Sequence, residues 1–323
     1  MLLLLYVDDI LFVGSDQRLM DRTVASLSEQ FAMKDFGFPS TFLNVQIRRT
    51  STGLFLSQEH YARRLIQHHG MENSNPTKTP LSPKFYPSAE GESLADPMPF
   101  RALIGSLQYL TLTRPDITYS VNQLSQFIQC PTVVHLQARR ILRYLNGSAA
   151  LGLPLKATDT TRLVTFADAD WAACPTTRRS TTGYAVYLGS TLISWRSKKQ
   201  PTVACSSTEA EYRAMAYAVA ETNWLSSLAR ELHISLSRPL LVCCDNLGAT
   251  YLAANPIQHN RTKHMDIDYH FVREQVQTGD VLIKYVPTKD QRADILTKNL
   301  GCASFAAQRS NLTLRYEHEL AAA

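Results

Sequence analysis

Two adjacent carboxylates near the start of the sequence could hold a divalent metal ion. Asp8 and Asp9 separate two apolar runs, residues 2–5 and 10–13, which is the pattern of a β-hairpin with acids at its tip. Carboxylates in such a position suit divalent cations that act on phosphates. Because Asp is also a favoured turn residue, an ordinary hairpin is the alternative. A metal site here needs a further acid from elsewhere in a sheet, and we expect no segment before the hairpin to supply it.

A second pair of acids, Asp168 and Asp170, follows an alternating apolar stretch. Val164, Phe166, Asp168 and Asp170 are two residues apart in turn, so a strand would place all four on one face. That face should be core, and an acid on it needs a charged partner or a position at the rim of the sheet. This segment alone leaves both interpretations open.

Glu209 and Glu211 open a long helix that we predict for residues 206–232. Ser206 with Glu209, and Thr208 with Glu211, both fit a capping box, so capping is one role for either glutamate. If Ser206 and Glu209 form the box, Glu211 lies about 200° further round the helix. Glu211 would then head a different face and need another reason to be there.

Two further acids stand at the ends of predicted elements. Asp245 ends the apolar strand predicted for residues 239–245, where it could cap the next helix or meet a ligand at the carboxyl end of the sheet. Asp294 lies in the first turn of a helix predicted for residues 293–300, where the helix dipole favours any acid. Each residue taken alone therefore has an ordinary structural alternative.

The four acids Asp168, Glu211, Asp245 and Asp294 are more specific together than apart. A strand acid, a glutamate heading a long helix, a strand-end acid and an acid in a terminal helix follow the order in which the ribonuclease H fold gathers four carboxylates. Such a cluster repels itself without cations, so we expect two Mg²⁺ ions, with Mn²⁺ as an alternative. One ion would activate a water molecule for attack, and the other would stabilise the leaving oxygen.

The elements that must position these acids differ between the two halves of the chain. In the first half we predict a strand at residues 41–49 and helices at residues 17–33, 58–70, 101–112, 121–127 and 135–145. The prolines between residues 73 and 100 preclude regular structure there and indicate a tether or a draped loop. Arg139, Arg140 and Arg143 favour a solvated face on the last helix, with contact to a phosphate backbone as the alternative.

The second half alternates strands and helices. We predict strands at residues 163–170, 181–189, 192–196, 239–245 and 281–286 and helices at residues 206–232, 247–254, 266–277 and 293–300. Three consecutive strands followed by alternating helices and strands indicate a mixed sheet covered by helices, and an α/β fold class.

The length, charge and cysteine content of the chain limit the class of protein to which it can belong. At 323 residues the chain exceeds one domain of about 100–200 residues, so two bodies are expected. The formal charge of +5 permits a polyanionic partner without requiring one. The six cysteines show no paired C-x-x-C spacing, which predicts reduced thiols in an intracellular compartment and no zinc site. Because Asp8 and Asp9 interrupt the first apolar run, we expect neither a signal peptide nor a membrane span.

The chain resembles the Pol polyprotein of copia-type LTR retrotransposons over residues 1–300. The resemblance rests on an ordered series of motifs: Tyr6-Val7-Asp8-Asp9, Thr113-Arg114-Pro115-Asp116-Ile117, Ala167-Asp168-Ala169-Asp170-Trp171, Thr177-Arg178-Arg179-Ser180-Thr181-Thr182-Gly183-Tyr184, Ser194-Trp195-Arg196-Ser197-Lys198-Lys199-Gln200, Ser206-Ser207-Thr208-Glu209-Ala210-Glu211-Tyr212, Cys244-Asp245-Asn246 and Ala293-Asp294-Ile295-Leu296-Thr297-Lys298.

The resemblance implies a division of the chain into four parts. These are a remnant of a reverse transcriptase palm (1–50), a thumb and connection region with a proline-rich tether (51–155, tether 73–100), a ribonuclease H-like domain (156–300) and a C-terminal tail (301–323). The implied fold is an α+β palm and thumb remnant followed by a mixed five-stranded ribonuclease H-like sheet with helices. The implied location is intracellular, in a cytoplasmic virus-like particle or in the nucleus.

The resemblance also assigns roles residue by residue. Asp8 and Asp9 match two polymerase metal ligands. The residues that match the nuclease acids and metal ligands are Asp168, Glu211, Asp245 and Asp294. In a segment like the primer-gripping strand, residues 41–45, Asn44 stands where glycine is usual, which puts close approach of a primer in question.

Other departures concern histidines and missing parts. Residues 288–292 hold no histidine, although many ribonucleases H have one before the last acid. His264 and His270 match the family without an assigned role. Because the resemblance places the fingers, most of the palm and the first polymerase acid upstream of residue 1, we expect no polymerisation by this chain alone. The upstream Pol segment is then a candidate partner.

Three functions compete. The leading hypothesis is a metal-dependent endonuclease that cuts the RNA strand of an RNA–DNA hybrid, held through backbone and 2′-hydroxyl contacts. Candidate phosphate contacts, weighed against ordinary surface charge, are Arg178, Arg179, Lys198 and Lys199. The second hypothesis is a transposon remnant that binds nucleic acid without catalysis. The third is DNA strand transfer, against which the place of Glu211 on the helix after the third strand argues.

Overall fold

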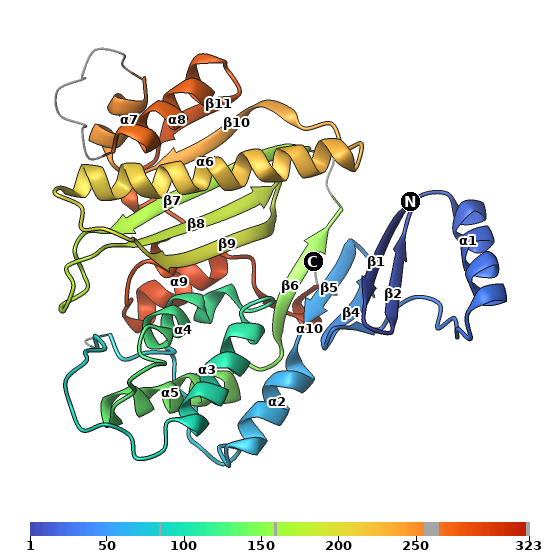
Figure 1. Ribbon diagram of the computed structural model, residues 1–323, viewed down its shortest axis with the longest axis horizontal. Coiled ribbons are helices and arrows are strands. Elements are labelled where there is room, and N and C mark those ends of the chain that lie inside the picture. Colours follow the sequence, from blue (N-terminus) through green and yellow to red (C-terminus); the bar gives the residue numbers. More distant parts are fainter. Residues whose placement is uncertain (84, 158–159, 255–264, 321–323) are drawn as a thin grey trace.

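Two five-stranded sheets, a two-stranded hairpin and a group of helices make up the molecule (Figure 1). The computed structural model describes residues 1–83, 85–157, 160–254 and 265–320. Asp168 lies on a strand of the mixed five-stranded sheet, and Asp245 directly follows another of its strands.

The mixed sheet consists of β7 (Arg162–Asp170), β8 (Thr181–Leu188), β9 (Thr191–Lys199), β10 (Ser237–Cys244) and β11 (Val281–Tyr285). Its spatial order is β11-β10-β7-β8-β9. The first three strands in sequence run antiparallel to one another, whereas β10 runs parallel to β7 and β11. The predicted mixed sheet of three consecutive strands followed by two separate ones is therefore confirmed.

Helices cover the mixed sheet because its two faces are both apolar. On one face lie α6 (Ser207–Glu231), α7 (Leu247–Ala254) and α8 (Asp266–Gln277) (Figure 1). Ala167 of β7 joins the core on that side, while its neighbour Phe166 joins the core on the other. This alternation is what a strand buried on both faces requires.

A second sheet, which is antiparallel throughout, is assembled from three distant parts of the chain. It contains β3 (Thr41–Phe42), β4 (Val45–Thr50), β5 (Gly53–Ser57), β6 (Leu151–Lys156) and β12 (Arg315–Tyr316) in the order β12-β6-β5-β4-β3. Both edge strands are two residues long. Short edges of this kind leave little free backbone for another chain to pair with.

The helical group lies below the mixed sheet in Figure 1. It consists of α2 (Glu59–His68), α3 (Met98–Leu110), α4 (Thr118–Ser125), α5 (Ala138–Asn146) and the 3₁₀ turns η1 (Pro115–Ile117) and η2 (Val133–Gln137). The proline-rich loop before α3 packs on this group through Leu81, which is buried in the same hydrophobic core as its helices. Asn299, from the C-terminal part of the chain, donates to the carbonyls of Ser82 and Phe85 at 2.6 and 2.9 Å.

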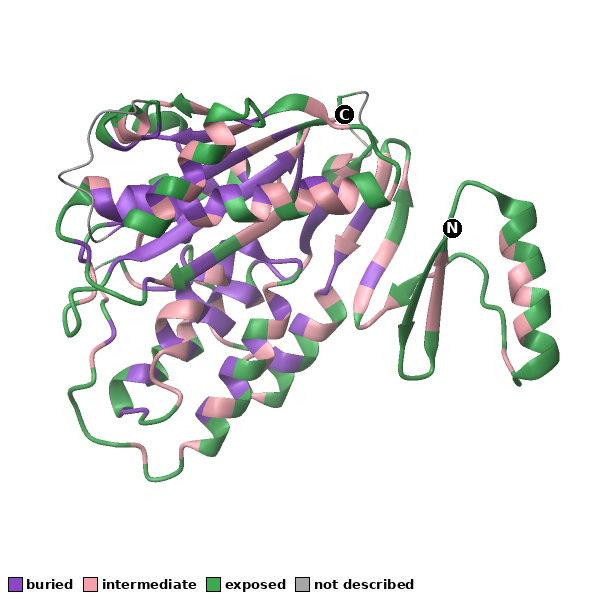
Figure 2. Ribbon diagram, turned by 45° about the horizontal axis from the view of Figure 1, so that its top comes forward, coloured by how far each residue is buried: buried purple, intermediate pink, exposed green. Residues whose placement is uncertain are grey.

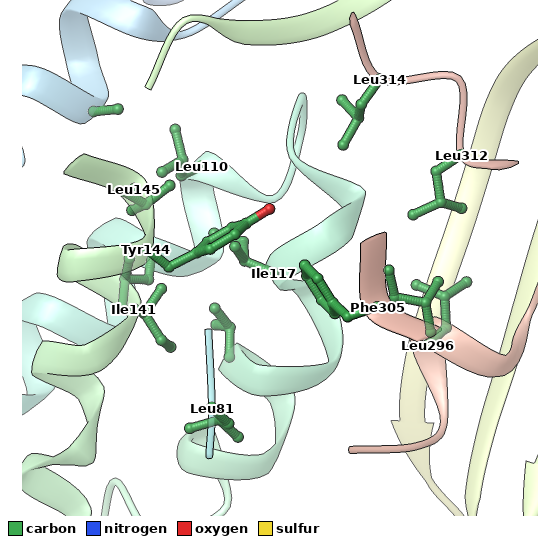
Figure 3. Close-up of a cluster of buried hydrophobic side chains, with 14 of the residues drawn as sticks. Leu81, Leu110, Ile117, Ile141, Tyr144, Leu145, Leu296, Phe305, Leu312 and Leu314 are labelled. Atoms are coloured by element: carbon green, nitrogen blue, oxygen red, sulfur yellow. The ribbon is translucent and has the colours of Figure 1, made fainter. Parts of the chain in front are cut away.

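One hydrophobic core joins the helical group to the mixed sheet and crosses the boundary predicted near residue 155. Tyr144 of α5 packs edge to face on Phe305 of α9 (Cys302–Asn311), with ring centroids 5.5 Å apart (Figure 3). Phe166 and Tyr187 of the mixed sheet belong to the same core. Residues 302–320, which we expected as a tail, form α9, β12 and α10 (Glu317–Leu320).

The N-terminal hairpin and the helix after it are largely exposed (Figure 2). The strands β1 (Leu2–Tyr6) and β2 (Asp9–Val13) form the predicted hairpin with Val7 and Asp8 at its tip. None of the residues of α1 (Gln17–Gln30) is buried.

Two predicted elements are wrong. Residues 41–49 form the hairpin β3–β4 instead of one strand, because Leu43 and Asn44 have positive φ values of 49° and 55°. Such a two-residue turn favours Asn or Gly, so Asn44 fits the position that glycine takes in the family pattern. Residues 293–300 form only the 3₁₀ turn η5 (Asp294–Leu296) instead of a helix. Of the other helices, those predicted at 247–254 and 266–277 have the predicted bounds, the rest are present with shifted ends, and the one predicted at 135–145 begins as η2.

Within the described ranges, no helix is long and apolar enough to cross a membrane.

Candidate functional site

Asp168 lies on the inner part of β7 with a fully buried side chain, on the face of Phe166. Its neighbour across the ladder is Gly183 of β8. A Cβ at Gly183 would lie 2.6 Å from Thr297 Cγ2 and 2.9 Å from Leu296 Cβ. The glycine therefore lets the segment around η5 lie directly on the sheet beside Asp168.

Glu211 reaches the site from the first turns of α6, and its neighbour Glu209 does the capping. Ser206 Oγ accepts from the Glu209 N–H at 3.1 Å, and Glu209 accepts from the Cys205 N–H and pairs with Arg213 at 2.6 Å. The capping alternative thus applies to Glu209, and Glu211 faces elsewhere, as the helical spacing predicted.

Asp245 follows the last residue of β10, and Asn246 rather than Asp245 caps the next helix. Asn246 Oδ1 accepts from the Ala249 N–H at 2.9 Å. The Asp245 carboxylate instead accepts from the Thr288 hydroxyl at 2.8 Å. The N-cap alternative for Asp245 is therefore excluded, and its carboxylate points across the end of the sheet.

Asp294 begins η5 and is nearly buried. Lys298, four residues later, places its Nζ 2.6 Å from Asp294 Oδ1 and 3.3 Å from Asp168 Oδ1. The Thr297 hydroxyl donates to Asp168. The turn that replaces the predicted helix thus supplies an acid, a hydroxyl and an ammonium to one point.

The four predicted acids meet at this end of the mixed sheet. Ligand oxygens of Asp168, Asp245 and Asp294 all lie within 4.8 Å of one another, and so do ligand atoms of Glu211, Cys244 and Asp245. Asp245 belongs to both groups and joins them into one cluster. Several carboxylates at this spacing are the hard oxygen donors that Mg²⁺ and Mn²⁺ prefer, so the residues present fit a divalent ion.

Burial and mutual repulsion raise the pKa values of the cluster. The pKa of Asp168 rises to about 6 through burial and the charges of Asp294 and Asp245, against the attraction of Lys298. Burial and the charges of Asp168 and Asp245 raise the pKa of Glu211 to about 9. Burial also raises the pKa of Asp294. In the metal-free cluster Glu211 therefore keeps its proton at neutral pH, whereas a bound cation would favour its charged form.

The pKa of Lys298 is also raised, which for a lysine favours the charged form. Burial lowers its pKa, but the carboxylates of Asp168, Asp294 and Asp245 outweigh burial and raise the pKa above the ordinary lysine value. Lys298 is therefore a charged ammonium at neutral pH.

Asp170, the second acid of the strand, serves a different purpose. Its carboxylate accepts from the Thr181 N–H. Burial and the Asp168 charge raise its pKa to about 8. Asp170 belongs to neither group of metal-ligating residues found among the described residues, and neither do Asp8 and Asp9. The last two are exposed at the tip of the N-terminal hairpin, at the opposite end of the molecule in Figure 1.

The four predicted phosphate contacts lie at the same end of the mixed sheet as the acids. Arg178 and Arg179 are exposed in the connection between β7 and β8, and Lys198 is exposed at the end of β9. Lys199 is half-buried, and its Nζ donates to Cys174 Sγ at 2.9 Å. Its ammonium therefore has a protein partner as well as a place at this edge.

Sequence reasoning missed several groups that shape the cluster. The hydroxyls of Thr288 and Thr297 orient two of the acids, and Cys244 places its Sγ 3.8 Å from Glu211 Oε2. The signal for Lys298 was its place four residues after Asp294 within the recognised motif. Of the two unassigned histidines, His264 lies outside the described residues, and His270 Nε2 lies 3.4 Å from Asp266 Oδ1 on α8.

Comparisons with known sequences match both halves of the chain. The family described as reverse transcriptase (RNA-dependent DNA polymerase) matches residues 1–83. The Retrovirus-related Pol polyprotein from transposon RE1 of Arabidopsis thaliana is 49% identical over 94% of this chain, which spans 21% of that polyprotein. An uncharacterized mitochondrial protein of Arabidopsis thaliana is 46% identical over 70% of this chain and 95% of its own length.

A comparison with solved structures gives a more distant likeness. The foamy viral protease-reverse transcriptase in complex with RNA/DNA hybrid covers 88% of this chain and 36% of its own, at 13% identity and a TM-score of 0.47.

Proposed function

The chain belongs to the copia-type retrotransposon Pol polyprotein family, and on that premise we propose that it hydrolyses the RNA strand of RNA–DNA hybrids. The observation that carries this proposal is the cluster of Asp168, Glu211, Asp245 and Asp294 at one end of the mixed sheet. The sequence of elements that brings these acids together is the one expected for a ribonuclease H-like domain.

The proposed reaction assigns separate tasks to the residues of the cluster. Asp168, Asp245 and Asp294 would hold one divalent ion, and Glu211 with Asp245 would hold the second. When bound, two Mg²⁺ ions, or Mn²⁺ in their place, would activate a water and neutralise charge on the leaving oxygen. The hydroxyls of Thr288 and Thr297 fix the carboxylates of Asp245 and Asp168, so these acids keep one orientation.

The proposed substrate would lie across the carboxyl end of β7 and the ends of β8 and β9. The exposed cations Arg178, Arg179 and Lys198 flank the acids there and would contact phosphates on either side of the scissile bond. Contacts of this kind do not read base edges, so little sequence preference is expected.

The test is cleavage of a hybrid whose RNA strand carries an end label, with the chain as given. We expect Mg²⁺-dependent cutting of the RNA strand, abolished by a chelator. Asp245→Asn should lower the rate by about 100-fold or more, because a metal-holding charge is lost. The matched control is Asp290→Asn, an exposed acid four residues before Asp294, which should leave the rate unchanged.

Three outcomes would contradict the proposal. Asp245→Asn could cleave the hybrid at the wild-type rate, or the wild-type chain could leave it intact while still binding it. The second outcome would favour nucleic-acid binding without catalysis. Preferential cutting of duplex DNA would instead favour strand-transfer chemistry.

Asp8 and Asp9 remain proposed ligands of a separate, polymerase-type metal site. Among the described residues they join no group of three metal ligands, so the proposal for this chain concerns hydrolysis and not polymerisation.

A further inference from the structure

The Lys298 ammonium contacts two acids of the cluster, Asp168 and Asp294. Its Nζ lies 2.6 Å from Asp294 Oδ1 and 3.3 Å from Asp168 Oδ1, the oxygens of two proposed metal ligands. The Asp168 carboxylate is fully buried, and that of Asp294 nearly so. Asp245 also attracts the ammonium, and among the charged groups that act on it in the described structure these three acids dominate.

The position of this ammonium opposes a metal ion on the same oxygens. Mg²⁺ binds carboxylate oxygens at about 2.0–2.1 Å and demands near-ideal octahedral geometry. An ammonium at hydrogen-bond distance takes up a lone pair of each oxygen and adds a repelling positive charge. The lysine side chain retains 36% of its exposure and has a flexible four-carbon stem. It therefore has a path from the cluster to solvent.

We propose that Lys298 is a built-in competing cation: its ammonium neutralises the metal-free cluster and must leave Asp168 and Asp294 before a divalent ion binds there. This inference rests on the proposed metal site. Lys298 is thus a positioning residue that sets the metal concentration at which the site fills. It also stabilises the folded chain when metal is scarce, because without it the acids would repel one another unopposed.

The test is a Mg²⁺ titration of the chelator-treated full chain by calorimetry, with unfolding temperature as a second readout. Lys298→Met removes the charge and keeps the length of the side chain. We expect its half-saturating Mg²⁺ concentration to fall by about tenfold, the equivalent of one competing ion pair. Its unfolding temperature should fall in chelator and recover when Mg²⁺ is saturating. A purely structural role would lower the unfolding temperature equally in both conditions.

Two further variants sharpen the result. Lys298→Arg keeps the charge and should bind Mg²⁺ no more tightly than the wild type. Lys284→Met removes an exposed lysine from the neighbouring strand β11 and should change nothing. If Lys298→Met does not fold in chelator, Lys298→Arg still tests the proposal. Tighter Mg²⁺ binding by Lys298→Arg than by the wild type would refute competition between the lysine charge and the metal ion. Unchanged or weaker Mg²⁺ binding by Lys298→Met would also refute it.

Hybrid cleavage separates this inference from the proposed function. If the Met variant binds Mg²⁺ more tightly and neither protein cuts the hybrid, the proposed function fails and the competition stands. If both cut the hybrid with the same Mg²⁺ dependence, the competition fails and the proposed function stands.

Discussion

Among the cysteines that the structure describes, Cys174 is the one whose surroundings favour the thiolate. Burial alone would raise its pKa, but hydrogen bonds from the Lys199 ammonium and the Thr177 hydroxyl lower the pKa to about 7. Because the thiolate is the nucleophile, about half of the Cys174 side chains would be reactive at neutral pH.

Alkylation of Cys174 should therefore rise with pH through a midpoint near 7. Peptide mass spectrometry after short exposure to iodoacetamide at a series of pH values measures this midpoint. In Lys199→Met the midpoint should move upward by about one pH unit, because the stabilising cation is gone. An unchanged midpoint would show that Lys199 does not hold the thiolate.

At the residue scale, sequence spacing predicted the separation of Glu211 from its capping neighbour, because helical geometry depends only on sequence distance. It could not decide between Asp245 and Asn246 as the helix cap, since both are good capping residues one position apart. It also could not place Lys298 on Asp168, because that contact depends on a turn that packs on a distant strand.

At the scale of elements, the fit of η5 against β8 depends on Gly183. Gly183→Ala would push Leu296 and Thr297 away from the sheet, carrying Asp294 with them. We expect a loss of stability of about 1–3 kcal/mol and a drop in hybrid cleavage. Denaturant unfolding and the cleavage assay measure the two effects.

The control for this change is Gly105→Ala on α3. No neighbour lies within 4 Å of the added Cβ there, so alanine should stabilise the helix by about 0.5–1 kcal/mol. Equal effects of the two substitutions would contradict the close approach at Gly183.

A buried ion pair at η1 is linked to α5 by the Tyr144 hydroxyl, which donates to Asp116. Arg114 and Asp116 lie 2.7 Å apart and are almost fully buried, and Arg114 also donates to the Ser148 carbonyl at 2.8 Å. Asp116→Asn would leave the guanidinium buried without its counter-charge, which costs about 3–5 kcal/mol. Asp280→Asn, in the exposed pair with Arg238, should cost less than about 1 kcal/mol. If urea unfolding showed similar losses of unfolding free energy for Asp116→Asn and Asp280→Asn, burial of the ion pair would not matter for stability.

The Arg114–Asp116 pair makes the stability of the folded chain depend on pH. Burial opposes ionisation of Asp116, but Arg114 and the Tyr144 hydroxyl outweigh burial and lower its pKa below the ordinary value. A lowered pKa stabilises the fold above the ordinary aspartate pKa, and this stability is lost as the pH falls through the lower, folded value. Asp116→Asn should therefore flatten the acid limb of the stability curve, measured by unfolding at a series of acidic pH values.

The elements themselves were largely predictable. Alternation and helical spacing are local, so the strands of the mixed sheet and the long helix α6 were placed from sequence. The errors at residues 41–49 and 293–300 arise where a positive φ or tertiary packing overrides the local pattern. The sequence also did not predict β5, β6 and the elements of residues 302–320.

At the scale of the whole molecule, the N-terminal hairpin and α1 form a weakly attached unit. The two strands pair with each other in a sheet of their own, and α1 has no buried residue. Limited proteolysis should cut first between residues 31 and 40, because such segments open at low free energy. The remaining chain should keep its unfolding temperature within about 2 °C. A cooperative loss of the whole fold after this cut would show that the hairpin supports the body.

The shared core was not predictable from sequence. All five strands of the mixed sheet lie between Tyr144 and Phe305 in sequence, and nothing in the local patterns of these two residues indicates that they meet. Their contact joins parts that the motifs alone assign to different regions.

The antiparallel sheet sets the order in which the chain can fold during translation. Its strand β6 pairs on one side with β5 and on the other with β12, near the last described residues. This sheet cannot close until β12 has left the ribosome, and contacts so distant in sequence form slowly. By contrast, β7, β8 and β9 are consecutive and form a local meander. A nascent chain would therefore assemble the strand that carries Asp168 before it could complete the sheet that begins far upstream.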